Sequence, residues 1–339
     1  MKKGLLVVLV LFLCIPSVLI AEGSGEKGTS QEKKIVMTFG EADSLGTPIN
    51  LANALFCKLV TEKTDGMITV NHIAGESLGN DIQVIEQMME GSVQFYGDVA
   101  GWYANWVKDL AILNWGFTFD DNDHVQRFFN SNSFEALSDE LIENAGIKIL
   151  GIAPTQPRIL FSRKPVHTIN DLNGLKMRVP DIRTYMLLWQ TFETNPNRVA
   201  WGEVYLGMKT GLLEAAEGPI GAAYGAKFHE SGPNVTLTNH LVSTYQVSMN
   251  NALFESLSPE NQKILLEAGQ EAADLAREVA EEGTIETLDK MVNEGATLIE
   301  LTPEARNAFV KKSTSAVETM ENDGEWRKGL WQEVRDLAQ

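Results

Sequence analysis

The sequence predicts an α/β protein that is long enough to form two domains, and three observations support this prediction. The chain has 339 residues, of which 44% are apolar, so it has the length of two ordinary globular domains. From Ile35 onward, short apolar runs alternate with helical patterns. A helical pattern that starts at Ser258 continues to about residue 293, and at ~1.5 Å per residue it spans ~50 Å. A helix of that length can cross from one lobe to another.

The first third of the chain follows a β-α-β-α-β order. Thr47 is placed to cap a helix whose first residue is Pro48, and Asn80 is placed to cap a second helix. Gly66 and Gly91 follow the last periodic residues of these helices and are expected to end them. The strands expected here cover residues 35–39, 67–73 and 93–96.

The later elements are predicted from the same signals. Ser258-Pro259-Glu260 is a strong helix start, although Gly269 and Gly283 are points where the long helix could be interrupted. Further helices are expected at 133–144 and 201–210, and strands at 147–152, 158–162 and 175–179.

The charge balance argues against nucleic acid as a partner. The chain has 28 Lys and Arg against 46 Asp and Glu, a formal net charge of −18, which repels a phosphate backbone. The two cysteines, Cys14 and Cys57, can form at most one bridge, so no disulfide framework is expected.

The first 21 residues have the pattern of an export signal. Lys2 and Lys3 precede an uncharged run whose apolar centre is too short to span a bilayer comfortably. We therefore expect a signal peptide at 1–21 and a periplasmic mature protein, with a lipid anchor on Cys14 as the alternative. Residues 22–34 are small, polar and charged, and are expected to form a disordered linker.

One motif suggests a hydrolase. Residues 75–79 read G-E-S-L-G, a G-x-S-x-G pattern between a predicted strand and a predicted helix, which is the context in which Ser77 would act as a nucleophile. However, only one strand precedes this unit, no His-Gly-Gly loop lies upstream, and the helix begins at Asn80 rather than directly after the serine. We therefore favour a small-residue turn that leads to a helix cap.

The sequence offers no strong metal or cofactor motif. The acidic residues 120–123 lack the spacing of a calcium loop and are interpreted as a helix start. The five histidines form no ligand pair, and no phosphate-binding glycine loop is present. Aromatic residues are dense at 102–119, where they either stack a ligand or, as is more common, pack a core.

Arg178 is the most informative residue, because it lies in an otherwise apolar strand. It sits near the carboxyl end of that strand, where open α/β sheets bind their ligands. A buried guanidinium needs an anionic partner, which is either a carboxylate of the protein or a carboxylate of a ligand. Arg158 opens the preceding strand and is a second candidate.

At this point the chain resembles a known family. The segments 174–180 (GLKMRVP), 195–219, 227–230 (KFHE) and 236–240 (TLTNH) resemble the solute-binding proteins of tripartite ATP-independent periplasmic (TRAP) transporters, dicarboxylate-binding group. The resemblance extends back through 116–125 and forward through 257–260. It implies a two-lobed periplasmic-binding-protein (Venus-flytrap) fold with a ligand cleft between the lobes and a long lobe-spanning C-terminal helix. The implied lobes are 35–155 plus 244–283, and 156–243 plus 284–339.

The resemblance also implies a set of ligand-binding residues. The arginine of the RVP segment, Arg178, would hold a ligand carboxylate at two points and Arg158 would assist, a geometry that suits a guanidinium. Trp201 would line the pocket and Glu217 would supply polar contacts. The family's usual Asn is replaced here by Gly218, which removes two donors and one acceptor. The remaining candidates are Arg198, Glu41 and Asp81. Arg198 lies either in the site or on the surface. Glu41 and Asp81 lie at loop positions that approach the cleft in similar proteins, although Asp81 could equally stabilise the first turn of its helix.

The implied function is a non-enzymatic binding protein. It would capture a small carboxylate or sugar acid as a monomer, close its lobes by hinge motion and deliver the ligand to the TRAP membrane subunits. We expect no cofactor, metal or catalytic residue. Two alternatives stay open, a secreted esterase that uses Ser77 and a ligand-binding input of a signalling system.

Overall fold

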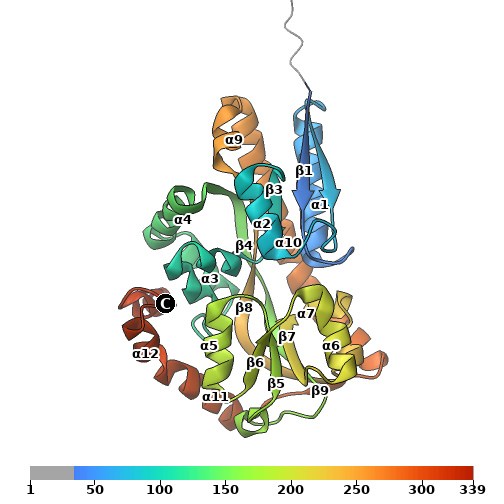
Figure 1. Cartoon of the computed structure of the whole chain (residues 1–339), viewed down its shortest axis with the longest axis vertical. Coiled ribbons are helices and arrows are strands. Elements are labelled where there is room, and N and C mark those ends of the chain that lie inside the picture. Colours follow the sequence, from blue (N-terminus) through green and yellow to red (C-terminus); the bar gives the residue numbers. More distant parts are fainter. Residues whose placement is uncertain (1–33, 339) are drawn as a thin grey trace, which may run out of the picture. The chain divides into compact units, whose positions relative to one another are not determined.

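One mixed sheet organises residues 34–338, the part of the chain that the structure, a computed structural model, describes (Figure 1). It has nine strands in the order β2-β1-β3-β8-β4-β7-β5-β6, and β9 pairs with β8. The strands are β1 Ile35–Gly40, β2 Ile68–Ile73, β3 Phe95–Asp98, β4 Ile147–Ser162, β5 Lys176–Val179, β6 Asn195–Arg198, β7 Ala215–Pro219, β8 Asn234–Asn250 and β9 Thr297–Ile299.

The helices pack around this sheet. The α-helices are α1 Pro48–Lys63, α2 Asp81–Glu90, α3 Asn122–Phe129, α4 Asn132–Ala145, α5 Arg183–Thr191, α6 Val204–Thr210, α7 Ile220–Gly225, α8 Phe228–Ser231, α9 Asn251–Ser256, α10 Pro259–Asn293, α11 Pro303–Ser315, α12 Val317–Asn322 and α13 Leu330–Asp336. Short 3₁₀ helices lie at η1 Ala100–Asn105, η2 Lys108–Asn114, η3 Ile169–Leu172 and η4 Trp201–Glu203. None of the helices in this part of the chain combines the length and the apolar character needed to cross a membrane.

Two long antiparallel strands, β4 and β8, connect two groups of parallel strands. β1 pairs in parallel with β2 and β3, and β5 pairs in parallel with β6 and β7. β3 joins one end of β8, whereas β7 joins the opposite end of β4 (Figure 1). The α/β class is therefore confirmed. The register of β4 against β8 is irregular between Pro154 and Pro157, beside the predicted lobe boundary, but the division into lobes stays a prediction.

The prediction of two separate strands at 147–152 and 158–162 is wrong. Both segments belong to the single strand β4, which pairs with β8 along its length. Pro154 and Pro157 lack the N–H that a ladder needs, and they lie where the register shifts, so irregularities in the pairing accommodate them. β3 also begins later than predicted, at Phe95 rather than at residue 93.

The predicted helix caps are confirmed. The side chains of Thr47, Asn80 and Ser258 each accept a hydrogen bond from a backbone N–H in the first turn of α1, α2 and α10. Asp121 does the same for α3, so the acidic segment at 120–123 is a helix start as predicted. Helix α10 ends at Asn293 as expected.

Neither predicted interruption of α10 occurs, because the helix is continuous over its 35 residues. Gly269 instead lets α10 approach β4 closely. A Cβ atom at Gly269 would lie 2.6 Å from the carbonyl oxygen of Leu150, and one at Gly151 would lie 2.0 Å from the carbonyl oxygen of Gly269. The glycine pair therefore sets the distance between the long helix and the sheet.

Three apolar clusters form the core. One packs α1 and α10 on β1, β3 and β8, and another packs α6 to α8 on β4 and β7. The largest joins side chains from 84–147 with side chains from 160–192 and 309–334, which come from both predicted lobes. The predicted signal segment 1–21, the Cys14 anchor and residues 22–33 of the predicted linker lie outside the described residues.

Candidate ligand-binding site

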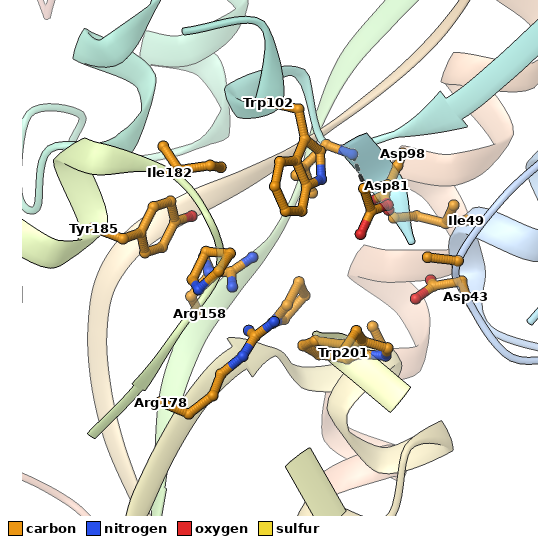
Figure 2. A pocket seen from close by; sticks show the side chains of 15 residues that line it. Asp43, Ile49, Asp81, Asp98, Trp102, Arg158, Arg178, Ile182, Tyr185 and Trp201 are labelled. Carbon is orange, nitrogen blue, oxygen red and sulfur yellow. Dashed lines mark hydrogen bonds between the residues drawn. The ribbon is translucent and has the colours of Figure 1, made fainter. Parts of the chain in front are cut away.

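A cavity lies where the carboxyl ends of β1, β3 and β5 meet strands β4 and β7. It contains about 460 Å³ of empty space, part of it open to solvent, and Figure 2 shows its lining side chains. The lining residues are Ala42, Asp43, Ile49, Asp81, Asp98, Val99, Trp102, Arg158, Arg178, Pro180, Ile182, Tyr185, Trp201, Pro219 and Ala222.

Arg178 is a buried cation without an acidic partner. It lies in β5 with 2% of its surface exposed, and its Nε donates a hydrogen bond to the carbonyl oxygen of Val199 at 2.9 Å. Its guanidinium carbon is 5.3 Å from the centre of the Trp201 ring. Within residues 34–338 no carboxylate forms an ion pair with it. Burial lowers the pKa of Arg178 to about 10, so the side chain is still charged at neutral pH.

Arg158, by contrast, is already paired. Its Nε and Nη2 donate to the two carboxylate oxygens of Glu217 at 2.6 and 2.7 Å, a two-point contact between β4 and β7. Burial by itself would raise the pKa of Glu217, but the ion pair with Arg158 outweighs it and lowers the pKa to about 2. His240 Nε2 lies 3.2 Å from Glu217 Oε2, and His240 Nδ1 lies 2.8 Å from Thr238 Oγ1. Behind the cavity wall, this chain of contacts holds Arg158 in place.

Three aspartic acids line the opposite side of the cavity. Asp43 accepts a hydrogen bond from Thr47 Oγ1 at 3.0 Å, Asp81 from Tyr96 Oη at 2.7 Å and Asp98 from the backbone N–H of Val99 at 2.6 Å. Burial and neighbouring acids raise the pKa of Asp43 and of Asp98 to about 7, and raise the pKa of Asp81 well above its usual range. The cavity therefore has basic groups on one side and acidic groups on the other.

Aromatic side chains form much of the rest of the wall. Trp102, Tyr185 and Trp201 face the cavity, and the centre of the Tyr185 ring is 5.2 Å from the guanidinium carbon of Arg158. Trp201 packs on Phe228 with 4.5 Å between ring centres, and its buried Nε1 has no hydrogen-bond partner in the described part of the chain. These flat faces suit the carbon chain of a small organic ligand.

Comparison with protein families decides the identity. The model of the bacterial extracellular solute-binding protein family 7, DctP, matches residues 39–323. The chain belongs to this family. The resemblance to TRAP solute-binding proteins that the sequence predicts is thereby confirmed.

Individual family 7 relatives agree with this assignment. A solute-binding protein of Sulfitobacter sp. strain NAS-14.1 is 32% identical over 71% of this chain and 73% of its own length. The 2,3-diketo-L-gulonate-binding periplasmic protein YiaO of Escherichia coli is 29% identical over 78% of this chain and 80% of its own length.

Solved family 7 structures share the fold. The sugar acid binding protein DctPAm of Advenella mimigardefordensis, in complex with galactonate, has a TM-score of 0.86 at 21% identity over 90% of this chain and 98% of that one. A TRAP periplasmic solute-binding protein of Sulfitobacter sp. with bound α-D-taluronate has a TM-score of 0.82 at 28% identity, and the match covers 89% of this chain and 98% of that one. The fold is thus that of TRAP periplasmic solute-binding proteins.

The structure places the residues predicted for a family 7 site at different depths. Arg178, Arg158, Trp201 and Asp81 line the cavity. Asp81 is also the first residue of α2, so it lies both at a helix start and on the cavity wall. Glu217 lies behind Arg158 and contributes nothing to the lining, which makes it a support rather than a contact surface.

Two further predicted residues lie away from the cavity wall. Glu41 is buried at the end of β1 beside Asn50, Asn53 and His72, and its Oε1 is 2.5 Å from Asn50 Nδ2. Arg198 forms a 2.9 Å ion pair with Asp181, and 47% of its side chain is exposed. Arg198 lines a neighbouring hollow that shares Arg178 and Trp201 with the cavity.

Four polar or aromatic lining residues were not among the predicted site residues, namely Asp43, Asp98, Trp102 and Tyr185. The rule that identified Arg178 applies equally to Asp98, which ends β3, and to Asp43, which follows β1. Trp102 belongs to the aromatic segment whose role the sequence left open. Tyr185 lies on helix α5, and no pattern in the sequence around it indicates a binding residue.

Ser77 does not have the surroundings of a nucleophile. Its Oγ donates a hydrogen bond to the carbonyl oxygen of Ala74 at 2.8 Å, and no histidine of residues 34–338 is hydrogen-bonded to it. The neighbouring Glu76 instead accepts a hydrogen bond from the N–H of Gly202 at 3.3 Å, which links this turn to the Trp201 segment. The esterase alternative is not favoured, as family 7 proteins are solute-binding components.

Proposed function

We propose that this TRAP solute-binding protein captures a sugar acid in the cavity, with the ligand carboxylate on Arg178. The observation that carries the proposal is the burial of Arg178 without an acidic partner among residues 34–338. An uncompensated guanidinium is costly in a protein interior, and a two-point contact with a ligand carboxylate offsets that cost. Arg158, held by Glu217, would orient one face of the same ligand.

Relatives support the choice of ligand class. Solved TRAP solute-binding proteins at 28% and 25% identity contain bound α-D-taluronate and D-glucuronate. Both of these ligands combine a single carboxylate with several hydroxyl groups. Tyr185 and the two tryptophans would pack against the ligand's carbon chain, while its polar groups face the charged side chains.

The location and the partners of the protein belong to the same proposal. The chain would act in the periplasm as a monomer, close on its ligand and pass it to the membrane subunits of a TRAP transporter. Two relatives of similar length are named as periplasmic binding proteins, which supports this location.

The test is isothermal titration calorimetry with D-glucuronate and L-galactonate. We expect Arg178→Ala to weaken binding by at least about 30-fold, which is about 2 kcal/mol, because it removes the charge that meets the carboxylate. Arg178→Lys should also fail, since an ammonium cannot make the two-point contact. The control is Arg183→Ala, which removes an exposed arginine that pairs with Glu325. Equal affinities for the wild type and the Arg178 variants would refute the proposal.

A further inference from the structure

The wall of the cavity opposite the arginines consists of three carboxyl groups. Figure 2 shows Asp43, Asp81 and Asp98 grouped on one side, with Arg158 and Arg178 across the cavity. They come from separate elements, the loop after β1, the first residue of α2 and the last residue of β3. All three side chains are buried, so solvent screens their charge only weakly.

The cations that line the cavity can neutralise only one ligand carboxylate. Arg158 and Arg178 are the two lining cations among the described residues, and Arg158 is neutralised by Glu217. Arg178 is thus the single uncompensated cation on a wall that faces three acids. A second carboxylate on the ligand would have to lie beside those acids without a cation of its own, so it would be desolvated without compensation and repelled by the acids that are ionised.

The same acids are good acceptors for hydroxyl groups. Each has two oxygens, and one oxygen of each takes a hydrogen bond from Thr47, Tyr96 or the Val99 N–H. Asp81 and Asp98 also share a hydrogen bond with each other, and the lone pairs that this leaves are available to donors in the cavity. The raised pKa values of Asp43 and Asp98 have the same origin, the shortage of positive charge and of water around these groups.

We propose that this acidic wall makes the site specific for acids with one carboxylate and several hydroxyl groups, and that it rejects dicarboxylates. The inference rests on the proposed function, in which Arg178 takes the ligand carboxylate. Family membership does not decide the point, because relatives include a C4-dicarboxylate-binding protein of Vibrio cholerae, 25% identical, as well as the binders of sugar acids.

The first experiment compares ligands that differ at one end. L-Galactonate and galactarate share a six-carbon chain and its secondary hydroxyls, but galactarate carries a carboxylate where galactonate has a terminal hydroxymethyl group. Calorimetry at pH 7.5 should show galactarate binding to the wild type at least tenfold more weakly than L-galactonate. D-Gluconate and glucarate form a second pair of this kind, and succinate, which lacks hydroxyls, should bind too weakly to measure.

The second experiment replaces ionisable groups of the wall one at a time. Asp43→Asn and Asp98→Asn keep the side-chain shape, and each should shift the galactarate to galactonate affinity ratio toward one by at least threefold. Asp289→Asn is the matched control, because it makes the same change in net charge at an exposed position on α10. Circular dichroism checks that each variant folds, and the wild-type ligand series is decisive by itself if one does not.

The outcomes separate this inference from the proposed function. Wild-type binding of galactarate or succinate as tight as that of L-galactonate, lost in Arg178→Ala, would overturn the inference and leave the proposed function standing. An unchanged affinity ratio in both folded asparagine variants would also overturn it. If none of the acids binds, the proposed function itself fails.

Discussion

Trp201 occupies space that is free only because residue 218 has no side chain. A Cβ atom at Gly218 would lie 2.9 Å from Cη2 and 3.3 Å from Cζ3 of the Trp201 ring. The ring in turn lies 5.3 Å from the Arg178 guanidinium carbon. The lack of a side chain at Gly218 therefore shapes the cavity beside Arg178.

At the residue scale, we expect Gly218→Ala to displace the Trp201 ring. The added methyl group overpacks the contact, which costs about 1–3 kcal/mol of folding stability unless the ring moves. Movement of the ring should shift the tryptophan emission spectrum and weaken L-galactonate binding several-fold. Emission and affinity that both match the wild type would show that the ring does not depend on this glycine.

At the element scale, the contact between α10 and β4 joins the two groups of strands. α10 packs along β4 and α1, and the close approach of Gly269 to Gly151 leaves no room for side chains between helix and strand. Gly283, in the same helix, has no atom within 4 Å of the position a Cβ would take. The two glycines therefore differ in packing although both lie inside one helix.

This difference predicts opposite effects of the same substitution. Gly269→Ala should lower the free energy of unfolding by about 1–3 kcal/mol, because the methyl group collides with the Leu150 carbonyl. Gly283→Ala should raise it by about 0.5–1 kcal/mol, because alanine is the better helix former and the site is open. Urea denaturation measures both values. A stabilised Gly269→Ala variant would contradict the close contact.

At the scale of the whole molecule, the buried acids of the cavity make stability depend on pH. In the folded protein Asp43 and Asp98 have pKa values of about 7, raised mainly by burial from the ordinary aspartate value of 3.8. Between these values the folded state holds more protons than the unfolded state. The free energy of unfolding therefore falls as pH rises through that window.

We thus expect the empty protein to lose thermal stability between pH 5 and pH 8. The double variant Asp43→Asn, Asp98→Asn should show a flatter profile, because asparagine does not titrate. Below about pH 4 the sign reverses, since Glu217, with its pKa lowered to about 2, then begins to lose its ion pair with Arg158. Thermal melts across this range test the prediction, and equal slopes for wild type and double variant would contradict it.

Local patterns were sufficient to predict much of the fold and part of the site. Thr47, Asn80 and Ser258 cap their helices through contacts within a few residues, so the signal lies in the adjacent sequence. Arg178 was detectable because a charge in an apolar strand is anomalous wherever the strand packs. The long helix to Asn293 followed from its Ser258-Pro259-Glu260 start signal and the helical pattern after it, and the family followed from ordered motifs.

Contacts between distant segments could not be predicted from the sequence. The continuity of β4 depends on its pairing with β8, and the position of Glu217 behind Arg158 depends on the pairing of β7 with β4. Whether Gly269 interrupts the long helix or permits a close contact could not be decided without knowing that it packs against Gly151. The three aspartic acids come from segments that only the fold brings to one wall. By itself the sequence determined the long helix and several shorter ones, the family, and the buried arginine that needs an anionic partner. The tertiary structure decided which charges face that cation, because pairing and burial depend on neighbours that no local pattern specifies.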